Sequence, residues 1–277
     1  MCGIFGYAGF ERDESLLRRM ADEVVARGPD DEGFLVGDWV GLGMRRLSII
    51  DVNNGHQPIF NEDNTLAIFF NGEIYNYKDL GKELRQKGYK FRTHSDTEVI
   101  LHLFEEYGPE CLNRLNGMFA LAIYNISKKT LFIARDRLGI KPLYYWSEGN
   151  GFLFGSEIKS ILESEKVSRV PNLAAIDHYL TSRYVPGPGT MFEGIYKFPA
   201  GHWGIWKGGI LEINKYWSPQ LHSGSYYSDQ YYHERFADLF EKSVRRRLMS
   251  EVPLGAYLSG GIDSSAIVAQ MSQLTNN

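Results

Sequence analysis

The second residue of the chain is a cysteine that directly follows a methionine. A methionine before a small residue is a typical site for removal of the initiator, which would place the α-amine of Cys2 beside its own thiol. An α-amine titrates near pH 7.7–8.0 and a free thiol near about 8.5, so a proton moves between them at little cost. Cys2 therefore combines a nucleophile and a base in one residue. Alone it could equally be a packed side chain, because free cysteines are often buried.

Six further motifs accompany Cys2 in a fixed order. They are Arg27-Gly28-Pro29-Asp30, Arg46-Leu47-Ser48-Ile49, Phe70-Asn71-Gly72-Glu73-Ile74-Tyr75-Asn76, Ser95-Asp96-Thr97-Glu98, Arg135-Asp136-Arg137-Leu138-Gly139-Ile140-Lys141-Pro142-Leu143-Tyr144-Tyr145 and Ser259-Gly260-Gly261-Ile262-Asp263-Ser264-Ser265. The first five motifs resemble the glutaminase domain of glutamine-hydrolysing asparagine synthetases, which are class II glutamine amidotransferases. The sixth resembles the pyrophosphate-binding loop of their synthetase domain. The resemblance covers essentially the whole chain.

The resemblance implies a nucleophilic attack by Cys2 on the carboxamide of glutamine, followed by hydrolysis of a thioester. The α-amine of Cys2 would carry the proton, through a water molecule. The resemblance assigns the oxyanion to the Asn71 side-chain amide and the Gly72 backbone N–H, which are neutral donors that can be held in place beforehand. An Asn-Gly pair alone would predict a hairpin turn. Its position inside the longer motif favours the catalytic interpretation.

Glutamine also carries an α-carboxylate and an α-ammonium that need partners. Arg46 offers a planar fork to the carboxylate, and Asp96 can accept from the ammonium with Glu73 assisting. Isolated arginines and aspartates are mostly surface residues, so the motifs carry this assignment. The motif Arg27-Gly28-Pro29-Asp30 is expected to gate or support the site. The expected glutamine-binding set is Arg46, Leu47, Ser48, Ile49, Ile50, Asn71, Gly72, Glu73 and Asp96.

Near the end of the sequence, an apolar segment at 254–258 is predicted to be a strand that leads through a Ser/Gly-rich turn into a helix at 264–274. This order directs backbone N–H groups and the helix dipole at an anion. The loop is not a Walker loop, because no Gly-Lys-Ser/Thr follows. A bare pair of glycines would only predict a turn before a helix. The expected ATP-binding set is Tyr257, Ser259, Gly260, Gly261, Asp263, Ser264 and Ser265.

The resemblance implies ATP, Mg²⁺ and aspartate for the complete synthetase and no cofactor for the glutaminase step. No metal ligand is expected in this sequence. Because so few residues follow the loop, we expect this chain alone to bind ATP weakly at most and to make no asparagine. Two alternatives stay open: an amidotransferase that acts on another carboxylate, and a catalytically idle binding or regulatory fragment. The mass of the N-terminus would separate an active enzyme from the idle fragment, because a retained Met1 blocks the amine.

Composition is typical of an ordinary enzyme: 277 residues, 43% hydrophobic and 23% charged. Thirty basic and 34 acidic residues give a formal charge of −4, which does not favour nucleic acid. The run Arg245-Arg246-Arg247 is interpreted as a solvated helix face. Two cysteines provide no disulfide framework, and no apolar stretch reaches membrane-spanning length. We therefore expect a cytoplasmic protein without a membrane partner, and a homodimer is one assembly left open.

Apolar patterning predicts many short strands and a few helices. Strands are expected at 34–36, 40–50, 66–73, 118–124, 130–135, 143–146 and 152–154, helices at 78–87, 97–107 and 226–247, and a hairpin at 205–217 that turns at Lys207-Gly208-Gly209. Periodicity alone gives an α+β class. The resemblance implies an N-terminal nucleophile fold, an αββα sandwich of two antiparallel sheets, followed by an incomplete α/β nucleotide-binding domain. The expected domains are 2–205 and 206–277.

Overall fold

The computed structural model describes residues 1–220, 224 and 226–275, and the chain divides into two compact units, Met1–Ser218 and Pro219–Asn277. The first unit contains two six-stranded sheets. The order in the first sheet is β10 (Ile195–Lys197), β8 (Tyr144–Glu148), β9 (Gly151–Gly155), β1 (Gly3–Ala8), β3 (Val40–Arg46) and β2 (Asp31–Val36). The order in the second is β12 (Ile210–Lys215), β11 (His202–Lys207), β7 (Thr130–Arg135), β6 (Gly117–Asn125), β5 (Leu66–Ile74) and β4 (Ile59–Phe60).

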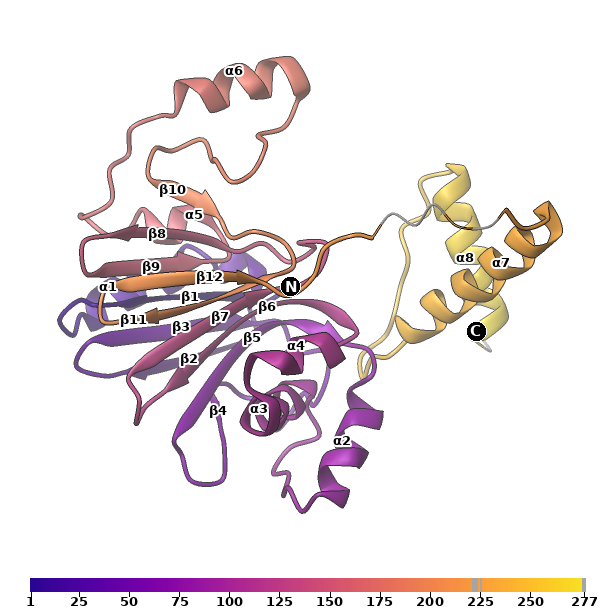
Figure 1. The fold of residues 1–277 in the computed structure, drawn as a ribbon, viewed down its shortest axis with the longest axis horizontal. Coiled ribbons are helices and arrows are strands. Elements are labelled where there is room, and N and C mark those ends of the chain that lie inside the picture. Colours follow the sequence, from indigo (N-terminus) through magenta and orange to yellow (C-terminus); the bar gives the residue numbers. More distant parts are fainter. Residues whose placement is uncertain (221–223, 225, 276–277) are drawn as a thin grey trace. The chain divides into compact units, whose positions relative to one another are not determined.

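The two sheets are stacked and helices cover their outer faces (Figure 1). All ten pairings among the described strands are antiparallel. On the first sheet pack α1 (Glu14–Asp22) and α5 (Ile158–Ile161). The second is covered by α2 (Tyr77–Gln86), α3 (Asp96–Tyr107) and α4 (Cys111–Arg114). The unit also contains α6 (Leu173–Ser182) and the short 3₁₀ helices Val25–Arg27 and Gly108–Glu110.

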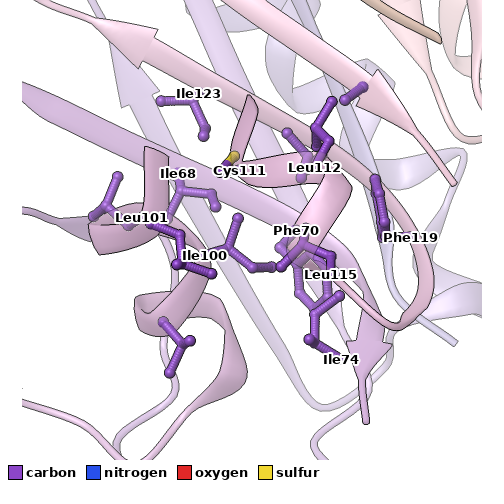
Figure 2. Packing of buried hydrophobic residues seen from close by; sticks show 14 of the residues in the cluster. Ile68, Phe70, Ile74, Ile100, Leu101, Cys111, Leu112, Leu115, Phe119 and Ile123 are labelled. Carbon is purple, nitrogen blue, oxygen red and sulfur yellow. The ribbon is translucent and has the colours of Figure 1, made fainter. Parts of the chain in front are cut away.

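Three apolar clusters fill the spaces between these layers, which gives the αββα sandwich. One lies between the first sheet and α1, one between the two sheets, and one between the second sheet and α2–α4. Figure 2 shows part of the third cluster, in which side chains of α3 and α4 pack against β5 and β6 around the sulfur of Cys111. Since β5 lies between two apolar layers, its side chains are buried on both faces: Phe70 belongs to the outer cluster and Phe69 to the inner one.

Helix α3 shows how the local sequence fixes an element that reaches the site. The Ser95 side chain caps its N-terminus by accepting the Thr97 N–H at 3.1 Å. The helix ends at Gly108, whose φ of +56° lies in the region that glycine tolerates best. Val99, Ile100 and Leu103 are buried, as helical spacing predicts. Asp96 is thereby placed in the first turn of a well-anchored helix.

The end of the first unit corrects the predicted boundary at residue 205. That residue lies inside β11, which pairs with β7 on one side and β12 on the other. The expected turn is present: Gly208 and Gly209 have φ of +55° and +87°, as a two-residue hairpin turn requires. The hairpin extends the second sheet by two strands, so the compact unit continues to Ser218.

In the second unit the structure describes two helices, α7 (Asp229–Arg246) and α8 (Ile262–Leu274). Both match predicted helices within a few residues. The strand predicted at 254–258 is wrong, because this segment has no regular secondary structure. A strand needs a hydrogen-bonded neighbour, and none of the described residues pairs with this segment.

Candidate active site

Side-chain alternation in three strands brings the predicted site residues together. Along β1 and β3, Ile4 and Met44 face the layer between the sheets, so Cys2 and Arg46, two positions away, lie on the same faces. Along β5, Phe69 faces this layer, and so does Asn71. All three residues line one cavity of about 60 Å³. Its lining is Met1, Cys2, Arg46, Leu47, Ile49, Ile50, Gly55, Gln57, Phe70, Asn71, Gly72, Glu73, Ser95, Asp96, Thr97 and Lys141.

Cys2 is held on both sides by the main chain and by Arg27. The Leu47 N–H donates to the Cys2 sulfur at 3.4 Å, and the thiol donates to the Leu47 carbonyl at 3.6 Å. The Arg27 Nε donates to the Cys2 carbonyl at 2.9 Å, and its Nη1 lies 3.3 Å from Glu157. Burial raises the pKa of the Cys2 thiol. With Met1 present, the structure therefore holds the sulfur in place and favours the neutral thiol.

Asn71 contributes an amide whose donor is unused. Its side chain is 1% exposed, and the Nδ2 atom has no hydrogen-bond partner among the described residues. Buried polar atoms nearly always have partners, and leaving one without costs about 1–3 kcal/mol. Asn71 and Gly72 lie within β5 and not at a hairpin turn. Strand β5 thus places a residue with an unpaired N–H donor in the lining of the same cavity as Cys2.

Gln57, which the sequence analysis did not select, fixes the strand just before Asn71. Its Oε1 accepts the Phe70 N–H at 2.7 Å, and its Nε2 donates to the Phe70 carbonyl at 3.3 Å. The same Nε2 donates to the Thr97 hydroxyl at 3.4 Å, which ties β5 to the first turn of α3. No motif marks a single glutamine in a loop, so the sequence carried no signal for this contact.

The Arg46 guanidinium is committed mainly to the protein. Its Nη2 donates to the carbonyls of Ile50 and Asp51 at 2.9 and 2.8 Å, and its Nη1 donates to Val52 at 3.3 Å. A Cβ on Gly55 would lie 2.3 Å from Nη2 and 2.8 Å from the Asp51 carbonyl oxygen, so a larger residue would displace the guanidinium and clash with the main chain. Arg46 thus fixes the loop at 50–55 that forms one wall of the cavity. Only its remaining N–H groups can reach a substrate.

Asp96 supplies the buried carboxylate of the cavity. It is 4% exposed, and its Oδ2 accepts the Ile74 N–H at 3.0 Å. Burial, with a smaller contribution from the nearby charge of Glu73, raises the pKa of Asp96 to about 6. Asp96 is therefore ionised at neutral pH but close to titration, and a cationic group in the cavity would stabilise its charge.

The remaining predicted residues divide between cavity and support. Leu47, Ile49, Ile50, Gly72 and Glu73 line the cavity, whereas Ser48 does not. The Ser48 N–H donates to Asp30 Oδ2 at 2.8 Å, and the Asp30 N–H donates to the Arg46 carbonyl at 3.1 Å. Like Arg27, Asp30 thus holds the backbone behind the cavity and is not part of its lining. Lys141 also lines the cavity. It belongs to the motif at 135–145, but the sequence did not predict it to be a site residue.

The predicted ATP loop lies in the second unit and is held by local contacts. The Ser259 and Ser264 hydroxyls are 2.9 Å apart, and Ser264 also donates to the Gly261 carbonyl at 3.1 Å. Helix α8 begins after Gly261 without a side-chain cap. Its first N–H groups and the hydroxyls suit an anion. Tyr257, Gly260, Asp263 and Ser265 are exposed.

Among residues 1–220, 224 and 226–275, no group of three or more His, Cys, Asp or Glu side chains is placed to hold a metal ion. Within the same residues, no helix has the length and apolar character needed to cross a membrane.

Comparison with known proteins identifies related sequences over the whole chain. "Asparagine synthetase [glutamine-hydrolyzing] 3" of Bacillus subtilis is 40% identical over 279 residues, which cover 97% of this chain and 45% of that protein. "Putative asparagine synthetase [glutamine-hydrolyzing] 2" of Methanocaldococcus jannaschii is 35% identical, and the match covers 100% of this chain and 58% of that protein. "Asparagine synthetase [glutamine-hydrolyzing] 2" of Arabidopsis thaliana is 35% identical, with 97% and 42% covered. The chain thus spans about half the length of these relatives.

Solved structures show the same fold. The glutamine phosphoribosylpyrophosphate amidotransferase from B. subtilis, complexed with ADP and GMP, superposes with a TM-score of 0.60 at 19% identity, over 79% of this chain and 50% of that one. The structure of the allosteric regulatory enzyme of purine biosynthesis superposes with a TM-score of 0.59 at 19% identity, over the same shares of the two chains. The expected sandwich of two antiparallel sheets is confirmed.

Family patterns agree with the division into units. The pattern of the glutamine amidotransferase domain matches residues 1–217, and that of asparagine synthase matches residues 235–277. The first match covers nearly all of the unit Met1–Ser218 and contains the whole cavity. The chain therefore belongs to the glutamine amidotransferase family.

Proposed function

We propose that this chain hydrolyses glutamine to glutamate and ammonia at Cys2, and that the ammonia serves an ATP-dependent amidation of aspartate in the complete enzyme. The observation that carries the proposal is the buried, unpaired Nδ2 of Asn71, a residue that lines the same cavity as Cys2. A buried donor without a partner is costly. It is useful where an oxygen gains negative charge during a reaction.

The mechanism begins when removal of Met1 frees the α-amine of Cys2. The α-amine accepts the proton of the thiol, and the sulfur attacks the carboxamide carbon of glutamine. Asn71 Nδ2 and the Gly72 N–H then stabilise the oxyanion of the tetrahedral intermediate. The α-amine returns a proton to the leaving nitrogen, ammonia departs, and a thioester to Cys2 remains. Water, activated by the same amine, hydrolyses the thioester and releases glutamate.

Binding of the substrate's other end would depend on charge. Asp96 lies in the cavity with an ionised carboxylate at neutral pH and can accept from the α-ammonium, with Glu73 adding negative charge. The free N–H groups of Arg46 would contact the α-carboxylate. The carbonyls of the 50–55 loop, which Arg46 holds, would shape the pocket for a chain of glutamine's length.

ATP use rests on the second unit and on the relatives. The 259–265 loop and the start of α8 would hold the pyrophosphate of ATP through backbone N–H groups and hydroxyls. ATP would activate the acceptor carboxylate by forming a mixed anhydride with it and releasing pyrophosphate, and Mg²⁺ would accompany its phosphates. Aspartate as acceptor follows from the names of the relatives. Both cysteines are free, which together with ATP favours a cytoplasmic location.

Glutaminase activity should be measured on protein whose N-terminal mass shows that Met1 is absent. Ammonia and glutamate should appear in equal amounts, and Cys2→Ala should abolish both. Cys111→Ala is the matched control, because Cys111 is buried in the apolar cluster of Figure 2 and burial raises its pKa to about 12. An electrophilic glutamine analogue should label Cys2 alone. Labelling that persists in Cys2→Ala, or hydrolysis unaffected by that change, would reject the proposal.

A further inference from the structure

Lys141 is an unusual component of the cavity. Among the described residues it is the only lysine in the buried class, with 4% of its surface exposed. Placing an ammonium away from water is costly unless nearby groups compensate. Such a residue needs a structural or a chemical reason.

A rigid loop holds the main chain around Lys141. The buried carboxylate of Asp136 accepts the N–H groups of Leu138, Ile140 and Lys141 at 3.1, 2.9 and 3.0 Å. The Arg135 guanidinium donates to the carbonyls of Lys141 and Gly139 at 2.7 and 2.8 Å. The buried Asp136 and the half-buried Arg135 thus shape one short loop, and the loop determines where the lysine can reach.

The ammonium of Lys141 lies beside the N-terminus of the chain. Its Nζ is 3.4 Å from the sulfur of Met1, and both residues line the cavity with Cys2 and Glu73. Burial lowers the pKa of Lys141, while the charges of Glu73 and Cys2 favour its protonated form. Other charged groups also influence the pKa values of Lys141, the Cys2 thiol and the Met1 α-amine. They are the Met1 α-amine itself, Arg27, Asp30, Arg46, Glu73 and Asp136.

We propose that Lys141 is a positioning residue for Cys2. The Lys141 ammonium stabilises the Cys2 thiolate, and it keeps the freed α-amine of Cys2 neutral so that the amine can accept a proton. The inference rests on the proposed function and deepens it, since it assigns a source of charge to the nucleophile. A fixed positive charge favours loss of a proton from both a thiol and an amine nearby. In the structure, which retains Met1, burial is the main influence on the Cys2 thiol and on the Met1 α-amine, and the Lys141 charge is one of several smaller influences that lower the pKa of each.

A purely structural role makes a different prediction. If Lys141 served only to balance the charge of the half-buried Glu73, its loss would destabilise the fold without changing the acidity of Cys2. The pH profile of thiol alkylation separates the two roles. It reports on the Cys2 thiolate and requires no turnover of glutamine.

The rate of Cys2 alkylation by iodoacetamide should be followed from pH 5 to 9, by peptide mass spectrometry, on protein lacking Met1. Compared with the wild type, Lys141→Met should move the midpoint upward by about half to one pH unit and slow alkylation several-fold near pH 7. Lys141→Arg should restore most of the shift. Lys197→Met is the matched control, because Lys197 is half-buried against the Val185 carbonyl and outside the cavity.

An unchanged profile in Lys141→Met, or an arginine variant as impaired as the methionine variant, would overturn the inference. If Lys141→Met does not fold, Lys141→Gln is judged by the same criteria. The failures are distinguishable: a shifted profile in a protein that does not hydrolyse glutamine would reject only the proposed function. Normal hydrolysis with no shift would reject only the role of Lys141.

Discussion

The cavity of the first unit and the 259–265 loop of the second contain similar polar groups, but the protein holds them differently. In the cavity, Asn71 is 1% exposed and Asp96 is 4% exposed. In the second unit Tyr257 is fully exposed and Ile262 is 84% exposed. The cavity groups are placed by strands and helices from distant parts of the sequence, whereas the loop contacts span at most five residues.

This difference shows what each region can do as the structure describes it. Buried polar groups interact strongly because water does not compete. The cavity therefore already has a fixed donor, Asn71, and a carboxylate with a raised pKa, Asp96. Exposed hydroxyls and N–H groups are solvated, and an anion must displace that water. We therefore expect substitutions in the cavity to have large effects and substitutions in the loop to have small effects on glutamine hydrolysis.

After loss of the nucleophile in Cys2→Ala, the largest effect is expected for Asn71→Ala. Loss of one oxyanion donor typically reduces turnover by roughly 10²–10³. Because Nδ2 has no partner among the described residues, no hydrogen bond of that atom is lost and stability should change little. Steady-state glutaminase kinetics should show a fall in kcat with KM nearly unchanged.

The matched control for that change is Asn61→Ala. Asn61 is equally buried, but it donates to Glu105 at 2.9 Å and accepts the Leu66 N–H at 2.9 Å. Its loss should lower the free energy of unfolding by about 1–3 kcal/mol with kcat retained in the folded protein. An Asn71→Ala variant that mainly raises KM would break the assigned role.

Asp96→Asn should affect stability and binding in opposite directions. The folded pKa of about 6 exceeds the ordinary value of 3.8, so the unfolded chain loses this proton first as the pH rises. The stabilisation from the protonated carboxyl is present below pH 3.8 and is lost above about pH 6. The variant should therefore gain up to roughly 3 kcal/mol over the wild type at pH 8, and little at pH 4.

Denaturant unfolding at pH 8 and at pH 4 tests the expected gain in stability, and the KM for glutamine tests the expected loss of binding. The wild-type KM should rise as the pH falls below about 6, because the protonated carboxyl no longer attracts the ammonium. In Asp96→Asn, KM should be high throughout. Stability that is lower than that of the wild type at pH 8 would contradict the assigned electrostatics.

Arg46→Lys should have an intermediate effect. Lysine keeps the charge but cannot contact three carbonyls and a substrate in one plane. We expect KM for glutamine to rise about tenfold, which corresponds to about 1.4 kcal/mol. Limited proteolysis should cut the 50–55 loop faster. A changed KM with unchanged proteolysis would indicate that Arg46 acts on the substrate alone.

The smallest effect is expected for Ser264→Ala in the second unit. Within the described part of the chain, its hydroxyl bonds to Ser259 and to the Gly261 carbonyl, both nearby in the sequence. Glutamine hydrolysis should stay within about twofold of the wild type, because Ser264 is a half-buried residue outside the cavity. Binding of pyrophosphate, measured by calorimetry, should weaken. A large loss of glutaminase activity would show that the two units are more strongly coupled than their separate contacts indicate.

Much of the fold was predictable, and the exceptions have physical causes. Strands with clear ends, such as β7, were predicted at their observed bounds because β-branched and aromatic residues lie between turns. Strand β1 was not predicted: all six of its side chains are buried, so it shows no alternation. The predicted strand at 254–258 failed because apolar residues alone do not supply a pairing partner.

The sequence likewise predicted part of the site and missed another part. The sequence pointed to Cys2, Arg46, Asn71 and Asp96, and the structure brings these four together in one cavity. It did not indicate that Ser48 would turn away to Asp30, or that Gln57 would bind the strand beside Asn71. Those contacts join residues 13 to 18 positions apart, and each depends on where a loop returns to the sheet.

By itself, the sequence determined which residue types were available, their order along the chain and the alternation that turns Cys2, Arg46 and Asn71 inward. Only the tertiary structure decided which buried groups have partners. Arg46 donates to carbonyls of the 50–55 loop, while Asn71 Nδ2 has no partner among the described residues. The reason is that burial and hydrogen bonding depend on distances between segments far apart in the chain. Those distances are fixed when the two sheets pack against each other.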